Sequence, residues 1–371
     1  MRVDWIRVVA VAVALAIAAC GGRPVQDGAS AGAAFGALTG PTAFAGGSAD
    51  RSADASAVCP PLPEPSPEGC TPPTGEPPPG APAPAPSPYM WLPEGPRLTN
   101  ASVGFTGVLA DTSTIQLTDG RWRMFLFAGD QYRSASSTDG LSFTMDPGTR
   151  MPVGLGHIRV VRLPDRRIRA FSIVHDGIVS SVSSDEGLTF TREPGHSVRA
   201  DAIGFTPSGA SLARMQNGTW RMYFSSLPRP GEGPQAHRIR SASSIDLLTW
   251  TLDQGVRIGP GSALEGGEHP AAIGNPDGSV SLVYFRATTF RMMMATSRDG
   301  LTFTSEFDTG ISQANDPDLV MLPDGSVRMY YNWGDNASGV IYSALYSGAP
   351  FSATAPLAAP KPSGEGGVRF R

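Results

Sequence analysis

The chain has 371 residues and a formal net charge of −4, with 29 Lys and Arg against 33 Asp and Glu. This balance leaves no basic stripe for a phosphate backbone, so nucleic acid is excluded as the expected partner. The first quarter is poor in large apolar residues, and the remainder suits one domain of about 270 residues.

The N-terminus is typical of an export signal. Positive charges precede an apolar run over residues 8–19, which is too short to cross a bilayer as a folded helix. The run ends in "IAAC" at Cys20, which resembles the lipobox of bacterial lipoproteins. That resemblance implies a signal peptide over residues 1–20 and lipidation of Cys20. Because Gly21 follows instead of Asp, it also implies an anchor in the outer membrane or at the cell surface. An ordinary secretory signal with a chance cysteine is the alternative.

Residues 21–88 are predicted to be a disordered tether. The segment is rich in Pro, Ala and Gly, as in "TPPTGEPPPGAPAPAPSP", and cannot bury enough surface to offset its ordering entropy. Cys59 and Cys70 lie within it, and in an exported chain they are expected to form a small disulfide loop. The third cysteine is Cys20, so the globular part contains neither a thiol nucleophile nor a cysteine zinc site.

Five hairpins of one pattern follow the tether. Each is an apolar stretch, a tight turn and an alternating strand, and they read "DTSTIQLTDGRWRMFLF" from Asp111, "HIRVVRLPDRRIRAFSI" from His157, "GASLARMQNGTWRMYFS" from Gly209, "HPAAIGNPDGSVSLVYF" from His269 and "DPDLVMLPDGSVRMYYN" from Asp316. Asp-Gly or Asn-Gly between such runs predicts a type I′ turn. Arginines at one offset in four hairpins are assigned to the repeat and not to substrate binding: Arg123, Arg169, Arg221 and Arg328.

A second repeated block follows each hairpin, for example "SSTDGLSFT" at Ser136 and "TSRDGLTFT" at Thr296. Its aromatic positions are spaced 47, 60, 53 and 48 residues apart, which is the spacing of four-stranded blades: Phe143, Phe190, Trp250, Phe303 and Phe351. The sequence therefore predicts an all-β, five-bladed β-propeller over residues 89–360, with a tail over 361–371. The stretch near "PRLTNASVGF" is expected to supply the outer strand that the fifth unit lacks.

Two propeller families share these motifs. The stretch Ser244–Trp250 resembles the S-x-D-L-x-x-W blade motif of the arabinanase, β-xylosidase and invertase glycosidases, and Asp316-Pro317 resembles the start of their inner strands. This resemblance covers about residues 95–355. The stretch Ser183–Phe190 is similar to the Asp-box of sialidase propellers. Those usually have six blades and an F/Y-R-I-P segment that this chain lacks, so the sialidase interpretation ranks lower. In both families such boxes form turns, so turn chemistry is their expected role here.

One column of the repeat carries polar residues. The residues eight positions before each turn are Asp111, His157, Gly209, His269 and Asp316. They include two of the five histidines in the chain. We expect a pocket in the central channel in which Asp111 faces a carboxylate of the fourth or fifth blade. Inverting glycosidases use two carboxyl groups about 6.5–9.5 Å apart, and such a pair would raise the pKa of one of them.

The glycosidase resemblance implies roles for these residues. Asp111 matches the catalytic base, and Glu268 matches the acid of an E-G-P stretch, with Asp316 as a third carboxylate. Residues expected to contact substrate are His157, Arg159, His269, Asp318 and Trp333. Trp333 and Tyr132 would stack on a sugar if they are exposed. The family's third-blade Asp is replaced by Ser208 and Gly209, so hydrolysis and non-catalytic glycan or protein binding both remain open.

Two further interpretations of the column stay open. Its Asp and His side chains would cap the inner strands around a water-filled pore, or His157, His269 and a carboxylate would hold a divalent metal. We assign no metal ligand and expect no required cofactor, with structural Ca²⁺ in the channel left open. The expected partners are a glycan and, through the lipid anchor, a membrane, and we expect a monomer.

Overall fold

The computed structural model describes residues 90–129, 131–151, 156–226, 228–229, 231–333 and 339–347. The predicted signal peptide with Cys20, the tether with Cys59 and Cys70, and the tail lie outside these residues. Within them, no helix is long and apolar enough to cross a membrane.

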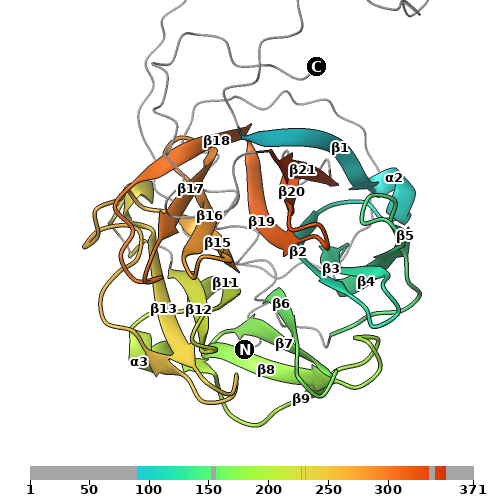
Figure 1. Cartoon of the computed structure of the whole chain (residues 1–371), viewed down its shortest axis with the longest axis horizontal. Helices are drawn as coiled ribbons and strands as arrows, with labels where there is room; N and C mark the ends of the chain where they lie inside the picture. Colours follow the sequence, from blue (N-terminus) through green and yellow to red (C-terminus); the bar gives the residue numbers. More distant parts are fainter. Residues whose placement is uncertain are drawn as a thin grey trace, which may run out of the picture. The chain divides into compact units, whose positions relative to one another are not determined.

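The described residues form five antiparallel sheets arranged around one axis, which confirms the predicted five-bladed propeller (Figure 1). The first blade contains β2 (Leu109–Gln116), β3 (Trp122–Ala128), β4 (Gln131–Ser137) and β5 (Thr144–Met145). The second contains β6 (Gly156–Arg162), β7 (Ile168–Val174), β8 (Gly177–Ser183), β9 (Thr191–Arg192) and β10 (Val198–Arg199). The third contains β11 (Pro207–Arg214), β12 (Trp220–Ser226), β13 (Arg238–Ser244) and β14 (Thr251–Leu252).

The fourth blade contains β15 (Glu268–Gly274), β16 (Val280–Arg286), β17 (Arg291–Ser297) and β18 (Glu306–Ser312). The fifth contains β19 (Ala314–Met321), β20 (Val327–Trp333), β21 (Val340–Tyr346) and, as its outer strand, β1 (Trp91–Thr99). Three short helical turns connect strands: α2 (Asn100–Val103), α3 (Ala200–Ile203) and the 3₁₀ turn η1 (Pro234–Ala236).

The ring is closed by the N-terminal strand. β1 pairs antiparallel with β21, from Trp91 opposite Tyr346 to Thr99 opposite Val340. Trp91 is buried and packs edge-on against Tyr346. The prediction that an N-terminal segment completes the fifth blade is therefore confirmed, and the last blade does not leave β21 as a free sheet edge.

The hairpin turns differ from the predicted type I′. In the first blade only Gly120 has positive φ (87°), whereas Asp119 does not, and the Gly120 N–H donates to the Leu117 carbonyl. This is a type I turn followed by one left-handed residue. The Asp119 carboxylate accepts the Arg121 N–H and so stabilises the turn without a left-handed φ of its own. Equivalent carbonyl bonds recur in the other four hairpins.

The repeated second block joins neighbouring blades. Its aromatic ring packs edge-on against a ring of the preceding blade, in the pairs Phe190–Phe125, Trp250–Phe171, Phe303–Tyr223 and, across the closure, Phe143–Tyr330. The buried Arg123 pairs with Asp146 of its own blade and donates to the Glu186 carbonyl of the next one. Arg169, Arg221 and Arg328 make similar contacts, which supports their assignment to the repeat.

The innermost strands share one irregularity that creates the site. Each of β2, β6, β11, β15 and β19 shifts register at the same position. The residue at the shift has positive φ in every blade: Asp111 (54°), His157 (44°), Gly209 (51°), His269 (50°) and Asp316 (47°). Four of these are not glycine, although Asp and His tolerate the left-handed region better than most residues. Backbone strain at a shared position is typical of a functional site.

Candidate functional site

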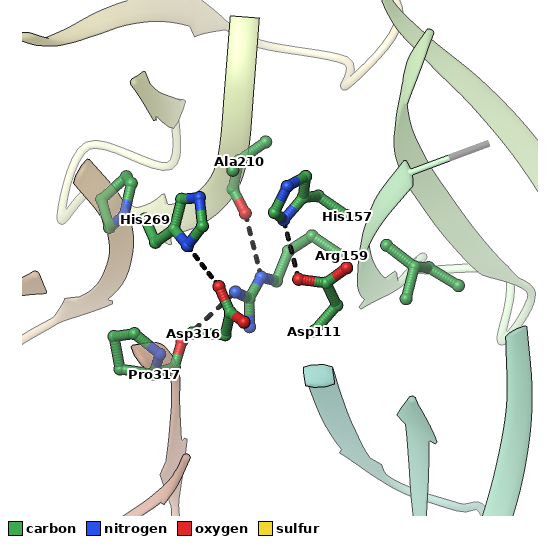
Figure 2. A pocket seen from close by; sticks show the side chains of 10 residues that line it. Asp111, His157, Arg159, Ala210, His269, Asp316 and Pro317 are labelled. Atoms are coloured by element: carbon green, nitrogen blue, oxygen red, sulfur yellow. Dashed lines mark hydrogen bonds and ion pairs between the residues drawn. The ribbon is translucent and has the colours of Figure 1, made fainter. Parts of the chain in front are cut away.

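The five register-shift residues surround one small cavity in the central channel. It is lined by residues of all five blades, including Asp111, His157, Gly209, His269 and Asp316. Figure 2 shows that the Asp and His side chains of this set point toward one another. The cavity volume is about 10 Å³, which is close to the least that holds a water molecule. A sugar ring would therefore have to bind at the mouth of the channel and not inside this cavity.

Asp111 and His157 form the first imidazole–carboxylate pair, with 2.9 Å between Nδ1 and Oδ1. The Tyr132 hydroxyl donates to the other carboxylate oxygen of Asp111 at 2.8 Å. Burial would raise the pKa of Asp111, but the attraction of His157 and these hydrogen bonds hold it well below its usual value. Burial and the Asp111 charge raise the pKa of Tyr132, so the phenol keeps its proton and donates it. Asp111 is thus a fixed, ionised carboxylate.

Asp316 and His269 form the second pair, through Nδ1 of the imidazole and a carboxylate oxygen (Figure 2). The Ser208 hydroxyl lies 3.2 Å from Nε2 of His269, and the Asn315 side-chain oxygen lies 3.1 Å from its Nδ1. Burial alone would lower the pKa of His269, but the Asp316 carboxylate raises it to about 10. His269 is therefore the charged partner of Asp316 at neutral pH.

The two histidines contact each other at the axis, with ring centroids 4.7 Å apart and ring planes at 62°. Gly209 makes room for this arrangement. A Cβ at position 209 would lie 3.0 Å from the Cα of His269 and 3.2 Å from its ring. A carboxylate at this position, which the glycosidase resemblance requires in the third blade, would therefore force His269 to shift.

Arg159 is a hub that joins four blades. Its guanidinium pairs with Asp318 of the fifth blade at 2.6 Å. It also donates to the carbonyls of Ala210 and Pro317 (Figure 2) and to that of Thr112. Burial raises the pKa of Asp318, although Arg159 opposes the shift. Both residues had been predicted to contact substrate, and in the structure their polar groups are directed to neighbouring blades.

Glu268 lies beside the cavity but is not among the residues that line it. It is the first residue of β15, and its carboxylate lies 3.4 Å from Nε2 of the buried His237. Burial lowers the pKa of His237, although Glu268 opposes this. Sequence reasoning missed His237 because it follows η1, in a connection outside the repeat.

Two details of the predicted pocket differ in the structure. Asp111 shares the cavity with Asp316 of the fifth blade, but it is ion-paired with His157 of the second blade, and this pairing lowers its pKa where repulsion between two carboxylates would raise it. Tyr132 is 3 % exposed and hydrogen-bonded to Asp111, so it cannot stack on a sugar. The side chain of Trp333 lies outside the described part, and its proposed contact with a sugar stays a prediction.

One group of side chains in the channel has the composition of a metal site. Ligand atoms of His157, His269 and Asp316 all lie within 4.8 Å of one another. Ca²⁺ takes six to eight oxygen ligands, and two imidazole nitrogens with one carboxylate do not fit that requirement. The structural Ca²⁺ left open by the sequence is therefore a poor match to these residues.

No protein-family model matches the chain, and no curated protein matches its sequence. Solved structures do. The endo-arabinase from Bacteroides thetaiotaomicron is similar with a TM-score of 0.53 and 14% identity, over 68% of this chain and 97% of that one. The GH43_1 enzyme from Xanthomonas citri, complexed with xylotriose, has a TM-score of 0.52 and 12% identity, over 72% of this chain and 96% of that one. A Dyadobacter fermentans protein of unknown function has a TM-score of 0.50 and 17% identity, over 65% of this chain and 80% of that one. At such identities the likeness defines the fold alone, which is that of the five-bladed arabinanase- and xylanase-like glycoside hydrolase propellers.

Proposed function

We propose that this protein is a surface-anchored propeller that acts on glycans or binds them at the mouth of its central channel. The observation that carries the proposal is Asp111, which is held ionised by Tyr132 and His157 at the start of the first blade's inner strand. The glycosidase resemblance assigns the catalytic base to this position. In the proposal, lipidated Cys20 and the tether over residues 21–88 hold the propeller at the bacterial outer membrane or cell surface.

Hydrolysis would proceed with inversion. Water attacks the anomeric carbon as the glycosidic C–O bond breaks, Asp111 takes a proton from the water, and Glu268 gives one to the departing oxygen. His237 assists this assignment, because burial lowers its pKa and so favours a neutral imidazole beside the Glu268 side chain. Asp316 contributes by fixing His269 and not by proton transfer.

A binding module without hydrolysis is the second candidate. It is favoured by Gly209, which leaves no third-blade carboxylate to tune an acid, and by the position of Glu268 outside the cavity lining. In this case the polar channel mouth would recognise a glycan through hydrogen bonds alone. The fold does not separate these two functions.

The test is product release from plant and microbial polysaccharides and aryl glycosides, measured beside calorimetric binding of the same oligosaccharides. The variants are Asp111→Asn and Glu268→Gln, and Asp119→Asn is the matched control because Asp119 lies at the exposed turn of the Asp111 hairpin. Turnover lost in both variants but kept in the control supports hydrolysis. Binding without turnover, lost in Asp111→Asn, supports the module. A wild-type protein that neither binds nor cleaves any glycan contradicts the proposal.

A further inference from the structure

His237 is a buried imidazole that lies beside Glu268 and outside the repeated column. It follows η1 in the connection from β12 to β13, so it belongs to the third blade, in which Gly209 provides no carboxylate. Its Nε2 lies 3.4 Å from Oε2 of Glu268. Within the described part of the chain, no other side chain forms a hydrogen bond or an ion pair with the Glu268 carboxylate. The third blade therefore presents an imidazole to the proposed acid.

We propose that His237 is a positioning residue for Glu268, whose carboxyl group it orients by donating its Nε2–H to one oxygen. This inference rests on the proposed hydrolysis. The other oxygen then faces the departing glycosidic oxygen and gives its proton to it, while the imidazole keeps its own proton. A hydrogen bond to an ionised acceptor is stronger than one to a neutral acceptor, so this contact gains strength as negative charge develops on Glu268. The distance of 3.4 Å is long for such a bond, and catalytic hydrogen bonds often shorten only when substrate is bound.

The surroundings of the His237 ring favour a proton on Nε2. Nδ1 is buried and has no hydrogen-bond partner among the described residues. A neutral imidazole carries one N–H, which would lack an acceptor at Nδ1 but faces Glu268 at Nε2. Burial and the charge of His269 lower the pKa of His237, although Glu268 opposes this, so the neutral ring is favoured. His237 is therefore suited to donate a hydrogen bond without transferring a proton.

Close backbone packing fixes the two partners relative to each other. A Cβ at position 266 would lie 2.7 Å from the His237 carbonyl oxygen, and one at position 267 would overlap the ring of Tyr284. Only because Gly266 and Gly267 have no side chains can the segment that leads into Glu268 pass so close to both. The imidazole and the carboxylate are thus held by neighbouring, tightly packed segments.

The first test compares the full-length wild type with His237→Leu and His237→Gln on phenyl and dinitrophenyl xylosides and arabinosides. Leu removes the donor, whereas Gln restores an N–H near the position of Nε2. Phenolate needs an acid in order to leave, so His237→Leu should lower kcat on phenyl glycosides by about 10–100-fold and change KM by less than about threefold. Dinitrophenolate leaves without an acid, so kcat on these substrates should change by less than about threefold. His237→Gln should recover most of the lost activity.

The pattern of losses separates positioning from a structural role. His196→Gln is the control, because His196 also pairs with an aspartate, Asp176, but lies beside the outermost strand β10 of the second blade. An unchanged kcat in His237→Leu, an equal loss on both leaving groups, or no recovery in His237→Gln would overturn the proposal.

The second test is nitrogen NMR of the His237 ring, which needs no glycan. We expect the neutral Nε2–H form at neutral pH, with a signal that moves in Glu268→Ala and stays constant in Glu265→Gln. Glu265 is the matched control, because it lies three residues earlier and its carboxylate pairs with Arg286. An Nδ1–H form, or a signal that Glu268→Ala leaves unchanged, would overturn the proposal even if glycans are cleaved. A protein that shows the coupling but cleaves no glycan would contradict the hydrolysis, and with it the catalytic role of this bond, but not the bond itself.

Discussion

Arg159 allows a quantitative test of how the blades are held around the channel. Replacing it with Met keeps much of the apolar stem and removes three hydrogen bonds to backbone carbonyls and the ion pair with Asp318. A neutral hydrogen bond contributes about 1 kcal/mol net and one to a charged group about 1.5–3 kcal/mol. Loss of one partner of a buried ion pair typically costs about 3–5 kcal/mol. We therefore expect Arg159→Met to lower the free energy of unfolding by about 4 kcal/mol.

Replacing Asp318 should destabilise the protein less than replacing Arg159. Burial raises the pKa of Asp318, which means that its charge is not fully compensated, and Asp318→Asn keeps an oxygen for the Thr114 N–H. We expect a loss of about 1–3 kcal/mol for this variant. In Arg159→Met, by contrast, the Asp318 carboxylate is left buried without its cation. Urea unfolding of both variants beside the wild type measures the difference. A loss below about 1 kcal/mol for Arg159→Met, or a larger loss for Asp318→Asn, would refute this account of the hub.

Three other predictions follow from the sequence and the fold. Cys20→Ala should move the protein from the detergent phase of a membrane extraction to the soluble fraction, and an unchanged partition would rule out the lipid anchor. Gly209→Ala should lower the free energy of unfolding by about 1–3 kcal/mol, because its Cβ would lie 3.0 Å from the Cα of His269 and residue 209 has positive φ. A variant as stable as the wild type, with unchanged NMR signals of His269, would contradict this. The turn carboxylates Asp139 and Asp246 have lowered pKa values, chiefly because backbone N–H groups donate to them. Their contribution to stability is therefore present above their unfolded pKa of about 3.9 and is lost as the pH falls toward the folded values. At pH values below about 4 the melting temperature should therefore decrease. A melting temperature that stays constant over this pH range would count against the role of these turns.

The fold was predictable because each blade repeats its own signals. Turn residues such as Asp119 with Gly120, and aromatic residues such as Phe143, mark equivalent positions in the repeat and do not depend on which residues line the central channel. The turn type was not predictable from Asp-Gly alone, because the Asp119 side chain accepts the Arg121 N–H and so stabilises a type I turn.

The site was predictable only in part. Position in the repeat was enough to bring Asp111, His157, His269 and Asp316 to one cavity, because equivalent residues of all blades meet at the axis. Which carboxylate pairs with which imidazole depends on side-chain direction at each register shift, and residue spacing does not contain that information.

Partners from outside the repeated column were hidden as well. Tyr132 reaches Asp111 from β4, the third strand of the first blade, and His237 lies in an irregular connection, so neither could be placed by alignment of the blades.

The measurement that tests the central claim most directly is an NMR titration of the histidine ring signals with the oligosaccharides that bind best. Five histidines give few signals, and the exposed His175 with the partly buried His196 serve as internal references. If a glycan binds at the channel mouth, the signals of His157 and His269 should shift with saturation while the references stay constant. Saturable binding that leaves both channel histidines unperturbed would contradict the placement of the glycan site.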